Sequence, residues 1–374
     1  MPYLGEKIKK LGFGMMRLPM IEDEVDIEQT KQMVDLFLEK GFTYFDTAYG
    51  YINGKSEEAI KTTLVDRYPR ESFQLATKLP AWAGAKTADE AKDMFWTSLK
   101  RTGAGYFDFY LLHNLGGNRT KAFDEFEIWD FLEQQKKKGL IKHLGFSLHD
   151  KADVLDEILT KHPEMEFVQL QINYTDWEND KIESRKCYEV ARKHNKPVII
   201  MEPVKGGSLA SLPDTAASIL KNANERVSLS SWALRFAASL DGLITVLSGM
   251  SDLDQMKDNL STMEDFTPIT SEEKSVISKV QEELDKVPRV PCTDCQYCLK
   301  ECPQDIAIPT IFGAMNTYLI YNNLKGAKGH YNMFVARNGG IASKCIECGK
   351  CEDACPQNIP IINELKKAAS LLEA

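Results

Sequence analysis

The distribution of cysteine is the feature that most constrains how this chain can fold. Eight of its nine cysteines lie between residues 292 and 355, and the first 291 residues contain only Cys187. A secreted framework of disulfides would not leave so long a stretch of chain without thiols and crowd them at one end. Clustered, reduced thiols therefore predict a small metal-binding module that follows a larger domain.

These eight cysteines form two copies of one motif. Each copy reads Cys-x-x-Cys-x-x-Cys-x-x-x-Cys-Pro, the first starting at Cys292 and the second at Cys345. This is the spacing of bacterial ferredoxins with two [4Fe–4S] clusters, in which the fourth cysteine of each copy ligates the other cluster. Paired zinc sites are the alternative, but zinc ribbons use Cys-x-x-Cys pairs without this longer pattern. We expect one cluster on Cys292, Cys295, Cys298 and Cys355, and the second on Cys302, Cys345, Cys348 and Cys351.

The module that carries these motifs is expected to be mostly helical. Pro303 to Lys344 separate the two motifs and include helical stretches such as Thr310–Tyr321. The segment 287–291 contains two prolines, which cannot continue a helix and so mark a domain boundary. We therefore predict a ferredoxin-like domain at residues 288–374, preceded by a polar helical linker at 269–287. Cys187 is expected to be an ordinary buried residue of a helix.

The first 268 residues alternate short apolar segments with amphipathic ones, at about thirty residues per unit. Eight such units predict an α/β fold of the (β/α)₈ TIM-barrel type at residues 1–268. A doubly wound sheet is the alternative, but the segment 12–17 lacks the third glycine of a dinucleotide fingerprint. The expected strands are Leu11–Met15, Tyr44–Asp46, Gln74–Lys78, Phe109–His113, His143–Ser147, Val168–Ile172, Val198–Met201 and Leu243–Leu247.

Helix signals lie between these strands. Asp26 is expected to cap a helix that ends near Lys40, with Gln29 at its third position, and Asp150 is expected to cap another. A longer polar helix is expected over Thr270–Val287. The other expected helices are Ala91–Lys100, Asp124–Lys138, Ile182–His194, Ser228–Ala238 and Leu253–Leu260.

Polar residues occur at the ends of three successive predicted strands. Asp46 ends the second strand, Lys78 the third and His113 the fourth, while Tyr51 follows Asp46 by five residues. Active sites of such barrels form at the carboxyl ends of the strands, so these four side chains are expected to meet at one rim. Any one of these residues could occur at a strand end by chance. Four such residues at or near successive strand ends favour a catalytic site.

These residues closely resemble the aldo/keto reductase family, in particular an iron–sulfur subgroup with a C-terminal two-cluster ferredoxin-type domain. The resemblance covers about residues 8–265 and includes Gly145-Phe146-Ser147 after the fifth strand, Val168-Gln169 in the sixth and Asn259 in the last helix. It implies a barrel oxidoreductase that reduces or oxidises a small carbonyl or alcohol. It also implies that Ser147 and Gln169 bind the nicotinamide carboxamide and that Asn259 binds the adenine.

The resemblance gives the four rim residues distinct roles in carbonyl reduction. Tyr51 would donate a proton to the carbonyl oxygen, and its ordinary pKa of about 10 needs adjustment for this task. Lys78 would stabilise the phenolate, Asp46 would hold Lys78 in place, and His113 would orient the carbonyl. Tyr49, two residues before Tyr51, is the competing candidate for the acid.

The sequence departs from the family pattern at the nucleotide site. Met201 stands where many relatives have an aromatic ring, and Leu148 where an asparagine often follows the serine. Residues 249–255 lack the basic side chains that usually bind a 2′-phosphate and contain Asp252 and Asp254 instead. NAD(P)H is therefore an expected cofactor without a preference for NADPH. A flavin would join hydride and one-electron chemistry, and it is not excluded although no flavin motif is recognisable.

Composition and charge limit the classes of partner that this protein is expected to bind. The net charge of −9 argues against a broad nucleic-acid-binding surface, and no apolar run approaches the length of a membrane span. The first residues lack the apolar core of a signal peptide, which indicates the cytoplasm. The expected partners are a carbonyl or alcohol substrate and a ferredoxin or flavoprotein. The alternatives are an electron-transfer protein with a non-catalytic docking barrel, or a non-redox enzyme with structural or sensing clusters.

Overall fold

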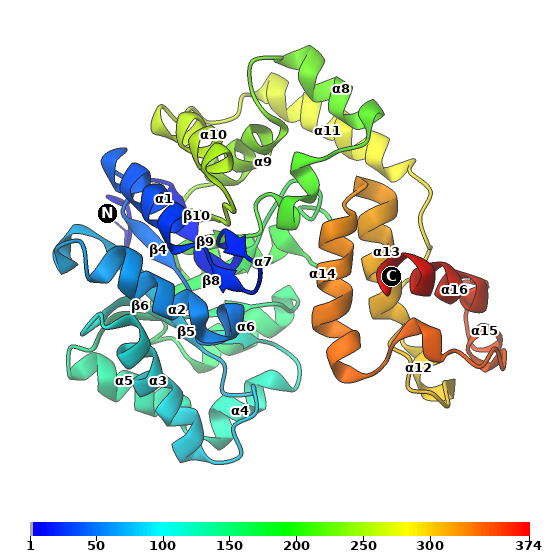
Figure 1. The fold of residues 1–374 in the computed structure, drawn as a ribbon, viewed down its shortest axis with the longest axis horizontal. Helices are drawn as coiled ribbons and strands as arrows, with labels where there is room; N and C mark the ends of the chain where they lie inside the picture. Colours follow the sequence, from blue (N-terminus) through cyan, green and yellow to red (C-terminus); the bar gives the residue numbers. More distant parts are fainter. Residues whose placement is uncertain (1–2) are drawn as a thin grey trace. The chain divides into compact units, whose positions relative to one another are not determined.

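The structure is a computed structural model that describes residues 3–374 (Figure 1). The chain divides into two compact units. The first runs to Pro203 and includes Ser230–Ile269, and the second comprises Val204–Leu229 and Thr270–Ala374. Among residues 3–374, no helix is long and apolar enough to cross a membrane.

The first unit is a closed barrel of eight parallel strands, which confirms the predicted fold. Its strands follow one another around the ring in the order β1-β10-β9-β8-β7-β6-β5-β4, and β4 pairs with β1 to close it. Every expected strand is present, with ends that differ by a few residues at most. The strands are β1 Leu11–Gly14, β4 Tyr44–Asp46, β5 Gln74–Leu79, β6 Phe107–Leu115, β7 Ile141–Leu148, β8 Phe167–Gln171, β9 Val198–Met201 and β10 Leu243–Ser248.

Helices alternate with these strands along the chain and surround the barrel (Figure 1). As predicted, Asp26 caps the first helix, and its carboxylate accepts a hydrogen bond of 3.0 Å from the backbone N–H of Gln29. The helices are α1 Ile27–Glu39, α2 Lys55–Ile60, α3 Ala88–Thr102, α4 Arg119–Glu125, α5 Ile128–Lys137, α6 Ala152–Lys161, α7 Ser184–Lys193, α9 Leu229–Ala238 and α10 Leu253–Glu264.

Three local features differ from the sequence-based expectation. The helix expected over Asp124–Lys138 is two helices, α4 and α5, separated where Glu127 adopts a left-handed φ of 54°. Asp150 does not cap α6, because its carboxylate accepts hydrogen bonds from the backbone N–H groups of Gly117 and Lys151. A short hairpin of β2 (Met20–Ile21) and β3 (Glu24–Val25) precedes α1 and was not expected.

Apolar side chains fill the interior of the barrel and support its carboxyl-terminal end. Residues two apart on a strand share a face. Asp46, Lys78 and His113 each lie two residues beyond a member of this interior cluster on the same strand, so they continue its columns toward the carboxyl ends. The cluster comprises Tyr44, Ala76, Phe109, Leu111, Phe167, Ile199, Ile244 and Leu247.

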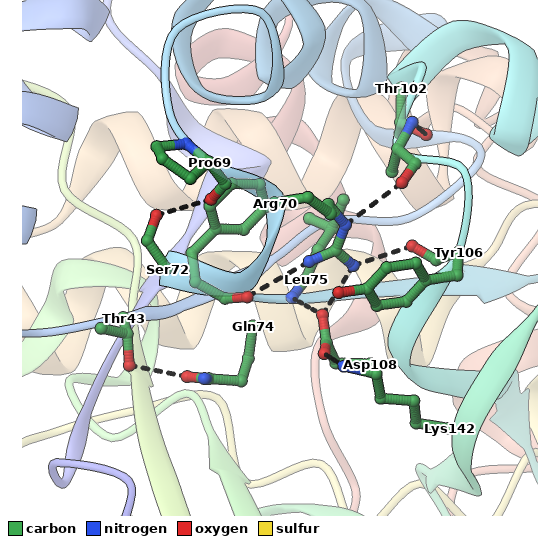
Figure 2. A network of polar contacts seen from close by, with 12 residues as sticks. Thr43, Pro69, Arg70, Ser72, Gln74, Leu75, Thr102, Tyr106, Asp108 and Lys142 are labelled. Atoms are coloured by element: carbon green, nitrogen blue, oxygen red, sulfur yellow. Dashed lines mark hydrogen bonds and ion pairs between the residues drawn. The ribbon is translucent and has the colours of Figure 1, made fainter.

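A charged network joins the opposite, amino-terminal ends of β5, β6 and β7 (Figure 2). Its centre is the buried carboxylate of Asp108, which accepts hydrogen bonds from Arg70 at 2.6 Å, the Leu75 N–H at 3.0 Å and Lys142 at 2.8 Å. Arg70 also donates to the Tyr106 carbonyl at 2.8 Å and lies 3.9 Å over the Tyr106 ring. This end of a TIM barrel serves stability, and the network fits that role.

We expect Asp108→Ala to lower the free energy of unfolding by about 3–5 kcal/mol, because it leaves Arg70 partly buried without its counter-charge. Denaturation followed by tryptophan fluorescence measures the change. Glu264→Ala is the control, since it removes only an exposed ion pair with Lys40 and should change stability little. Equally small effects of both substitutions would contradict a stabilising role for Asp108.

The second unit is mostly helical, as predicted for the part of the chain that contains the thiols. The polar helix expected over Thr270–Val287 is α11, which begins with a capping box between Thr270 and Glu273. It packs against helix α8. The sequence did not predict α8, because few of its side chains are apolar and buried. The helices of this unit are α8 Asp214–Ala223, α11 Ser271–Asp285, α12 Tyr297–Glu301, α13 Ile308–Tyr321, α14 Leu324–Phe334, α15 Lys350–Asp353 and α16 Ile361–Leu372.

Candidate active site and thiol clusters

The four predicted rim residues meet at the carboxyl-terminal end of the barrel. Asp46 ends β4, Lys78 and His113 lie near the ends of β5 and β6, and Tyr51 begins the short turn η2 (Tyr51–Gly54) after β4. Asp46 and Lys78 are buried, whereas Tyr51 and His113 are partly exposed. The site therefore has a charged pair at its base and two hydrogen-bonding rings nearer to solvent.

Lys78 connects the members of this site. Its ammonium lies 2.5 Å from Asp46 Oδ1, 2.7 Å from the Thr47 carbonyl oxygen and 3.5 Å from the Tyr51 hydroxyl. Burial alone would lower the pKa of Lys78, but the charges of Asp46 and Tyr51 outweigh it and raise the pKa. Lys78 therefore stays an ammonium and donates a hydrogen bond to the Tyr51 oxygen, which leaves the Tyr51 proton free for another acceptor.

The environment of Tyr51 corrects one sequence-based expectation. Lys78 does lower the pKa of the Tyr51 hydroxyl, as expected, but burial has the larger and opposite effect, and the net pKa is raised. Tyr51 is therefore protonated at neutral pH. Lys78 limits this rise and stabilises the phenolate only once a proton has left.

His113 presents a neutral imidazole to Tyr51. The two rings lie edge to face, with centroids 5.8 Å apart. Burial first, and then the positive charge of Lys78, holds the pKa of His113 well below its usual value. Its Nδ1 atom is buried without a hydrogen-bond partner among residues 3–374. The indole of Trp82 donates to the His113 carbonyl at 2.8 Å and fixes this end of β6.

Tyr49, the competing candidate, is held away from this chain of contacts. The Arg101 guanidinium lies 4.6 Å over the Tyr49 ring and donates to the Tyr49 carbonyl at 2.9 Å. Arg101 is in turn 3.3 Å from the buried carboxylate of Glu57, which also accepts a hydrogen bond of 2.8 Å from Thr77. The geometry favours Tyr51 as the acid.

Glu57 and Arg101 were not singled out from the sequence, yet together they anchor the turn that carries Tyr51. The turn contains left-handed residues at Ile52, Asn53 and Gly54. Gly54 has a φ of 92°, a backbone conformation that favours glycine, and a Cβ there would also lie 2.7 Å from the Arg101 guanidinium carbon. An arginine 44 residues from its carboxylate partner has no local sequence signal that could have identified it.

The predicted nucleotide-binding residues occupy two places. Ser147 and Gln169 are partners in the register between β7 and β8, and both are buried. Ser147 accepts a hydrogen bond of 2.7 Å from the Asn114 N–H, and Gln169 Oε1 is buried without a partner among residues 3–374. An unpartnered buried amide oxygen beside a hydroxyl fits a ligand that carries an amide. Separately, Asn259 donates to Ser248 at 2.8 Å.

The segment 249–255 comprises the loop after β10 and the first residues of α10. Asp252 caps α10, because its carboxylate accepts hydrogen bonds from the Gln255 N–H at 2.8 Å and side chain at 2.7 Å. Arg17, from the start of the barrel sequence, lies near this segment. A Cβ added at Gly249 would be 3.7 Å from the Cβ of Arg17, a proximity that the local sequence of residues 249–255 does not reveal.

The eight clustered thiols line two cavities in the second unit, grouped as the crossed pattern predicts. The space between the lining atoms of each, counted together with the solvent at its opening, is about 310–320 Å³. Ile308 lies in the wall of both. The first cavity is lined by Cys292, Cys295, Cys298 and Cys355, and the second by Cys302, Cys345, Cys348 and Cys351.

The thiols fit a cluster better than a single ion. Among residues 3–374, no three His, Cys, Asp or Glu side chains converge closely enough to hold one metal ion, whereas four thiols surround each cavity. Burial, followed by the neighbouring cysteines, raises the pKa of Cys298 and of Cys351 to about 11. Such thiols become thiolates when bound iron supplies the positive charge.

The two thiol loops have left-handed residues at equivalent positions. Asp294 and Glu347, which occupy equivalent positions in the two motifs, have φ values of 60° and 58°. Asp305 and Asn358, each three residues after a fourth cysteine, have φ values of 50° and 51°. The second unit therefore contains an internal repeat, and the repeat explains why the two cavities are alike.

Comparison with known sequences agrees with this geometry. The profile of the aldo/keto reductase family matches residues 10–282. This chain belongs to the aldo/keto reductase family. A second profile, described as a 4Fe-4S dicluster domain, matches residues 291–359. This aldo/keto reductase is thus an oxidoreductase with an added dicluster domain.

The following relative and solved structures are similar to about three quarters of this aldo/keto reductase. An uncharacterized oxidoreductase of Bacillus subtilis, YqkF, is 24 % identical over 75 % of this chain and 96 % of its own. Among solved structures, the holo form of aldo-keto reductase AKR11C1 from Bacillus halodurans is 27 % identical, with a TM-score of 0.60, over 75 % of this chain and 95 % of its own. An aldo-keto reductase from Klebsiella pneumoniae in complex with NADPH shares the fold, at 20 % identity and a TM-score of 0.59, over 74 % of this chain and 93 % of its own.

Proposed function

We propose that this aldo/keto reductase transfers hydride between NAD(P)H and a small carbonyl or alcohol at Tyr51, and that its two clusters exchange single electrons with a ferredoxin or flavoprotein. The observation that supports the barrel chemistry most is the chain of contacts from Asp46 through Lys78 to Tyr51 at the barrel mouth. The hydroxyl of a partly exposed tyrosine with a buried ammonium behind it suits proton donation to a carbonyl oxygen.

In this mechanism each residue acts on charge or on position. NAD(P)H supplies the hydride when it is bound. Tyr51 donates its proton to the carbonyl oxygen as negative charge develops there. Lys78 stabilises the phenolate that remains, and Asp46 keeps Lys78 charged and in place. His113, being neutral, donates a hydrogen bond to the same oxygen and orients the carbonyl.

The nucleotide would lie across the mouth of the barrel. Ser147 and Gln169 would hold the nicotinamide carboxamide, for which the unpartnered Gln169 oxygen is an acceptor. Asn259 would bind the adenine near the start of α10. Two aldo/keto reductase structures from Klebsiella pneumoniae with the same fold are in complex with NADPH or NADP, which is in keeping with a nicotinamide nucleotide as the cofactor.

We expect the anaerobically purified protein to bind NADH at least as tightly as NADPH. Residues 249–255 contain no lysine or arginine, and Asp252 and Asp254 would repel a 2′-phosphate. Equilibrium titration of both nucleotides, followed by fluorescence, measures the difference. NADPH binding more than tenfold tighter, a gap of about 1.4 kcal/mol, would contradict this expectation. Absence of binding by either nucleotide would contradict the proposed function itself.

In the second unit, the two sets of four thiols would hold one [4Fe–4S] cluster each. When bound, each cluster carries one electron at a time, so an external ferredoxin or flavoprotein would exchange electrons with it. Oxygen-sensitive clusters and free thiols fit a reducing compartment, and we propose the cytoplasm. We also propose residues 1–268 as the reductase domain, 269–287 as a linker and 288–374 as the cluster domain.

A further inference from the structure

Strand β6 has an irregularity where it carries His113. Its register against β7 shifts at this point, so that His113 and Asn114 both lie opposite the single residue Ser147. The pairs on either side are Leu112 with Phe146 and Leu115 with Leu148. Two residues opposite one form a β-bulge, which commonly re-aims a side chain beside an active site. The extra residue, Asn114, is therefore a candidate for a role in binding.

The backbone of Asn114 is held in an unusual conformation next to Ser147. Its φ of 59° is left-handed, which asparagine tolerates better than most residues but which still costs free energy. Its N–H donates to the Ser147 hydroxyl oxygen at 2.7 Å, and its carbonyl accepts a hydrogen bond of 2.8 Å from Arg119. Because the N–H of Asn114 contacts Ser147, the short side chain of Asn114 also lies close to Ser147.

Two buried amide oxygens near Ser147 lack a partner. Asn114 Oδ1 is buried without a hydrogen-bond partner among residues 3–374, and the same holds for Gln169 Oε1. Ser147 connects them, because it binds the Asn114 N–H and is the register partner of Gln169. A buried polar atom that stays unpaired costs free energy, so the two oxygens indicate a ligand with two donors. A third such atom nearby, His113 Nδ1, belongs to the ring that faces Tyr51.

The polar groups around Ser147 are complementary to a primary carboxamide. A carboxamide has two N–H donors and one carbonyl acceptor. Asn114 Oδ1 and Gln169 Oε1 are the two acceptors. The Ser147 oxygen already accepts the Asn114 N–H, which leaves the Ser147 proton for the carbonyl of a ligand. The next residue of β7, Leu148, is apolar and buried, so it adds no polar side chain. A carboxamide would thus satisfy all three groups at once.

We propose that Asn114 positions the nicotinamide by accepting one N–H of its carboxamide, while Gln169 accepts the other. This inference rests on the proposed function, because it concerns the same nucleotide. Asn114 is a positioning residue, which holds the nicotinamide ring and takes no part in proton or hydride transfer. The bulge couples the two tasks, since the preceding residue, His113, orients the carbonyl. The enzyme should therefore require a nucleotide with a primary carboxamide.

The reduced 3-acetylpyridine analogue of NADH tests this proposal. In the analogue a methyl group replaces the NH₂ of the carboxamide, and the carbonyl remains. Calorimetric titration of the anaerobic protein measures the affinity for each nucleotide without turnover. We expect the wild type to bind NADH about ten- to hundredfold more tightly than the analogue, because the analogue leaves two buried acceptors unpaired.

Substitutions at Asn114 assign its share of this preference. Asn114→Gly removes the amide and keeps the backbone, because glycine adopts a left-handed φ freely. The preference for NADH should then fall about three- to tenfold, the worth of one hydrogen bond. Asn114→Asp keeps an acceptor oxygen and should retain most of the preference. Asn195→Gly is the control, since Asn195 is also left-handed, with a φ of 56°, but is exposed between α7 and β9. Both nucleotides are measured on the same variant, so a general loss of affinity cancels in the ratio.

The outcomes separate this inference from the function on which it rests. Equal wild-type affinities for NADH and the analogue would overturn the inference and leave the proposed function standing. An unchanged preference in Asn114→Gly would also overturn it, and a raised KM for the aldehyde would then assign the amide to the substrate. A preference that depends on Asn114, in a protein that reduces no aldehyde, would support the inference and contradict only the proposed hydride transfer. Absence of binding by either nucleotide would contradict both.

Discussion

Tyr51→Phe is expected to lower turnover by about 10²–10⁴-fold, because it removes the proton donor and keeps the ring. Nucleotide and substrate affinities should change little, since the phenyl ring retains the edge contact with His113. Iron content should not change, because the thiols belong to the other unit. Steady-state kinetics with an aldehyde that the wild type reduces measure the effect.

Tyr49→Phe is the matched control for this substitution. It removes the same hydroxyl two residues away, from a ring that lies against Arg101 and not beside Lys78. We expect its activity to stay near that of the wild type. Full activity in Tyr51→Phe together with loss of activity in Tyr49→Phe would move the acid to Tyr49. Full activity in both would favour a barrel that serves only for docking.

Lys78→Met should also reduce turnover, because it removes the cation that limits the pKa of Tyr51. It would leave the buried carboxylate of Asp46 without a counter-charge, and that alone is strongly destabilising. The double variant Asp46→Asn with Lys78→Met removes both charges and should restore most of the lost stability. Turnover should stay low in the double variant, which separates the effect on Tyr51 from the effect on folding.

Cys302→Ala removes one ligand from the cavity of Cys345, Cys348 and Cys351 in the crossed arrangement, although it lies in the first motif of the sequence. The wild type should contain about eight irons, four per cluster. The variant should lose the same cluster signal as Cys345→Ala, while Cys292→Ala should lose the other. Iron analysis and electron paramagnetic resonance of the reduced protein measure these losses.

Cys187→Ala is the control for the cysteine series. Cys187 is buried in α7 of the barrel, and burial raises the pKa of its thiol to about 12, so it should not take part in cluster binding. Its removal should leave both signals intact. A loss in Cys302→Ala that matches Cys292→Ala would contradict crossed ligation, and stoichiometric zinc without iron would contradict the clusters.

The barrel could be predicted from local sequence because each strand is a short apolar run and each connection contains a helix signal. The same local reasoning failed at Asp150, whose carboxylate is engaged by the Gly117 N–H from a loop 33 residues earlier. It also missed α8, whose buried residues are mostly alanine and form no clear apolar stripe. The role of Asp150 and the formation of α8 both depend on residues that are distant in the sequence and close in the folded protein.

The candidate site was predictable to a similar degree. Asp46, Lys78 and His113 could be placed from their positions at strand ends, and the four cysteines around each cavity from their spacing. The net rise in the pKa of Tyr51 could not be predicted from the sequence, because it depends on how deeply the hydroxyl is buried. The support of the Tyr51 turn by Arg101 and the proximity of Arg17 to Gly249 could not be predicted either, since each joins segments far apart in the sequence.

The central claim is that the barrel transfers hydride from a nicotinamide directly to a carbonyl carbon, and deuterium tracing tests it most directly. The anaerobic protein is supplied with butanal and with NADH deuterated at one of the two C4 positions, and the alcohol is examined by mass spectrometry. We expect one deuterium at C1 of 1-butanol from one of the two labelled forms and none from the other. Formation of 1-butanol without deuterium from either form would contradict direct transfer, because the reducing electrons would then have come through the clusters and the hydrogen from water.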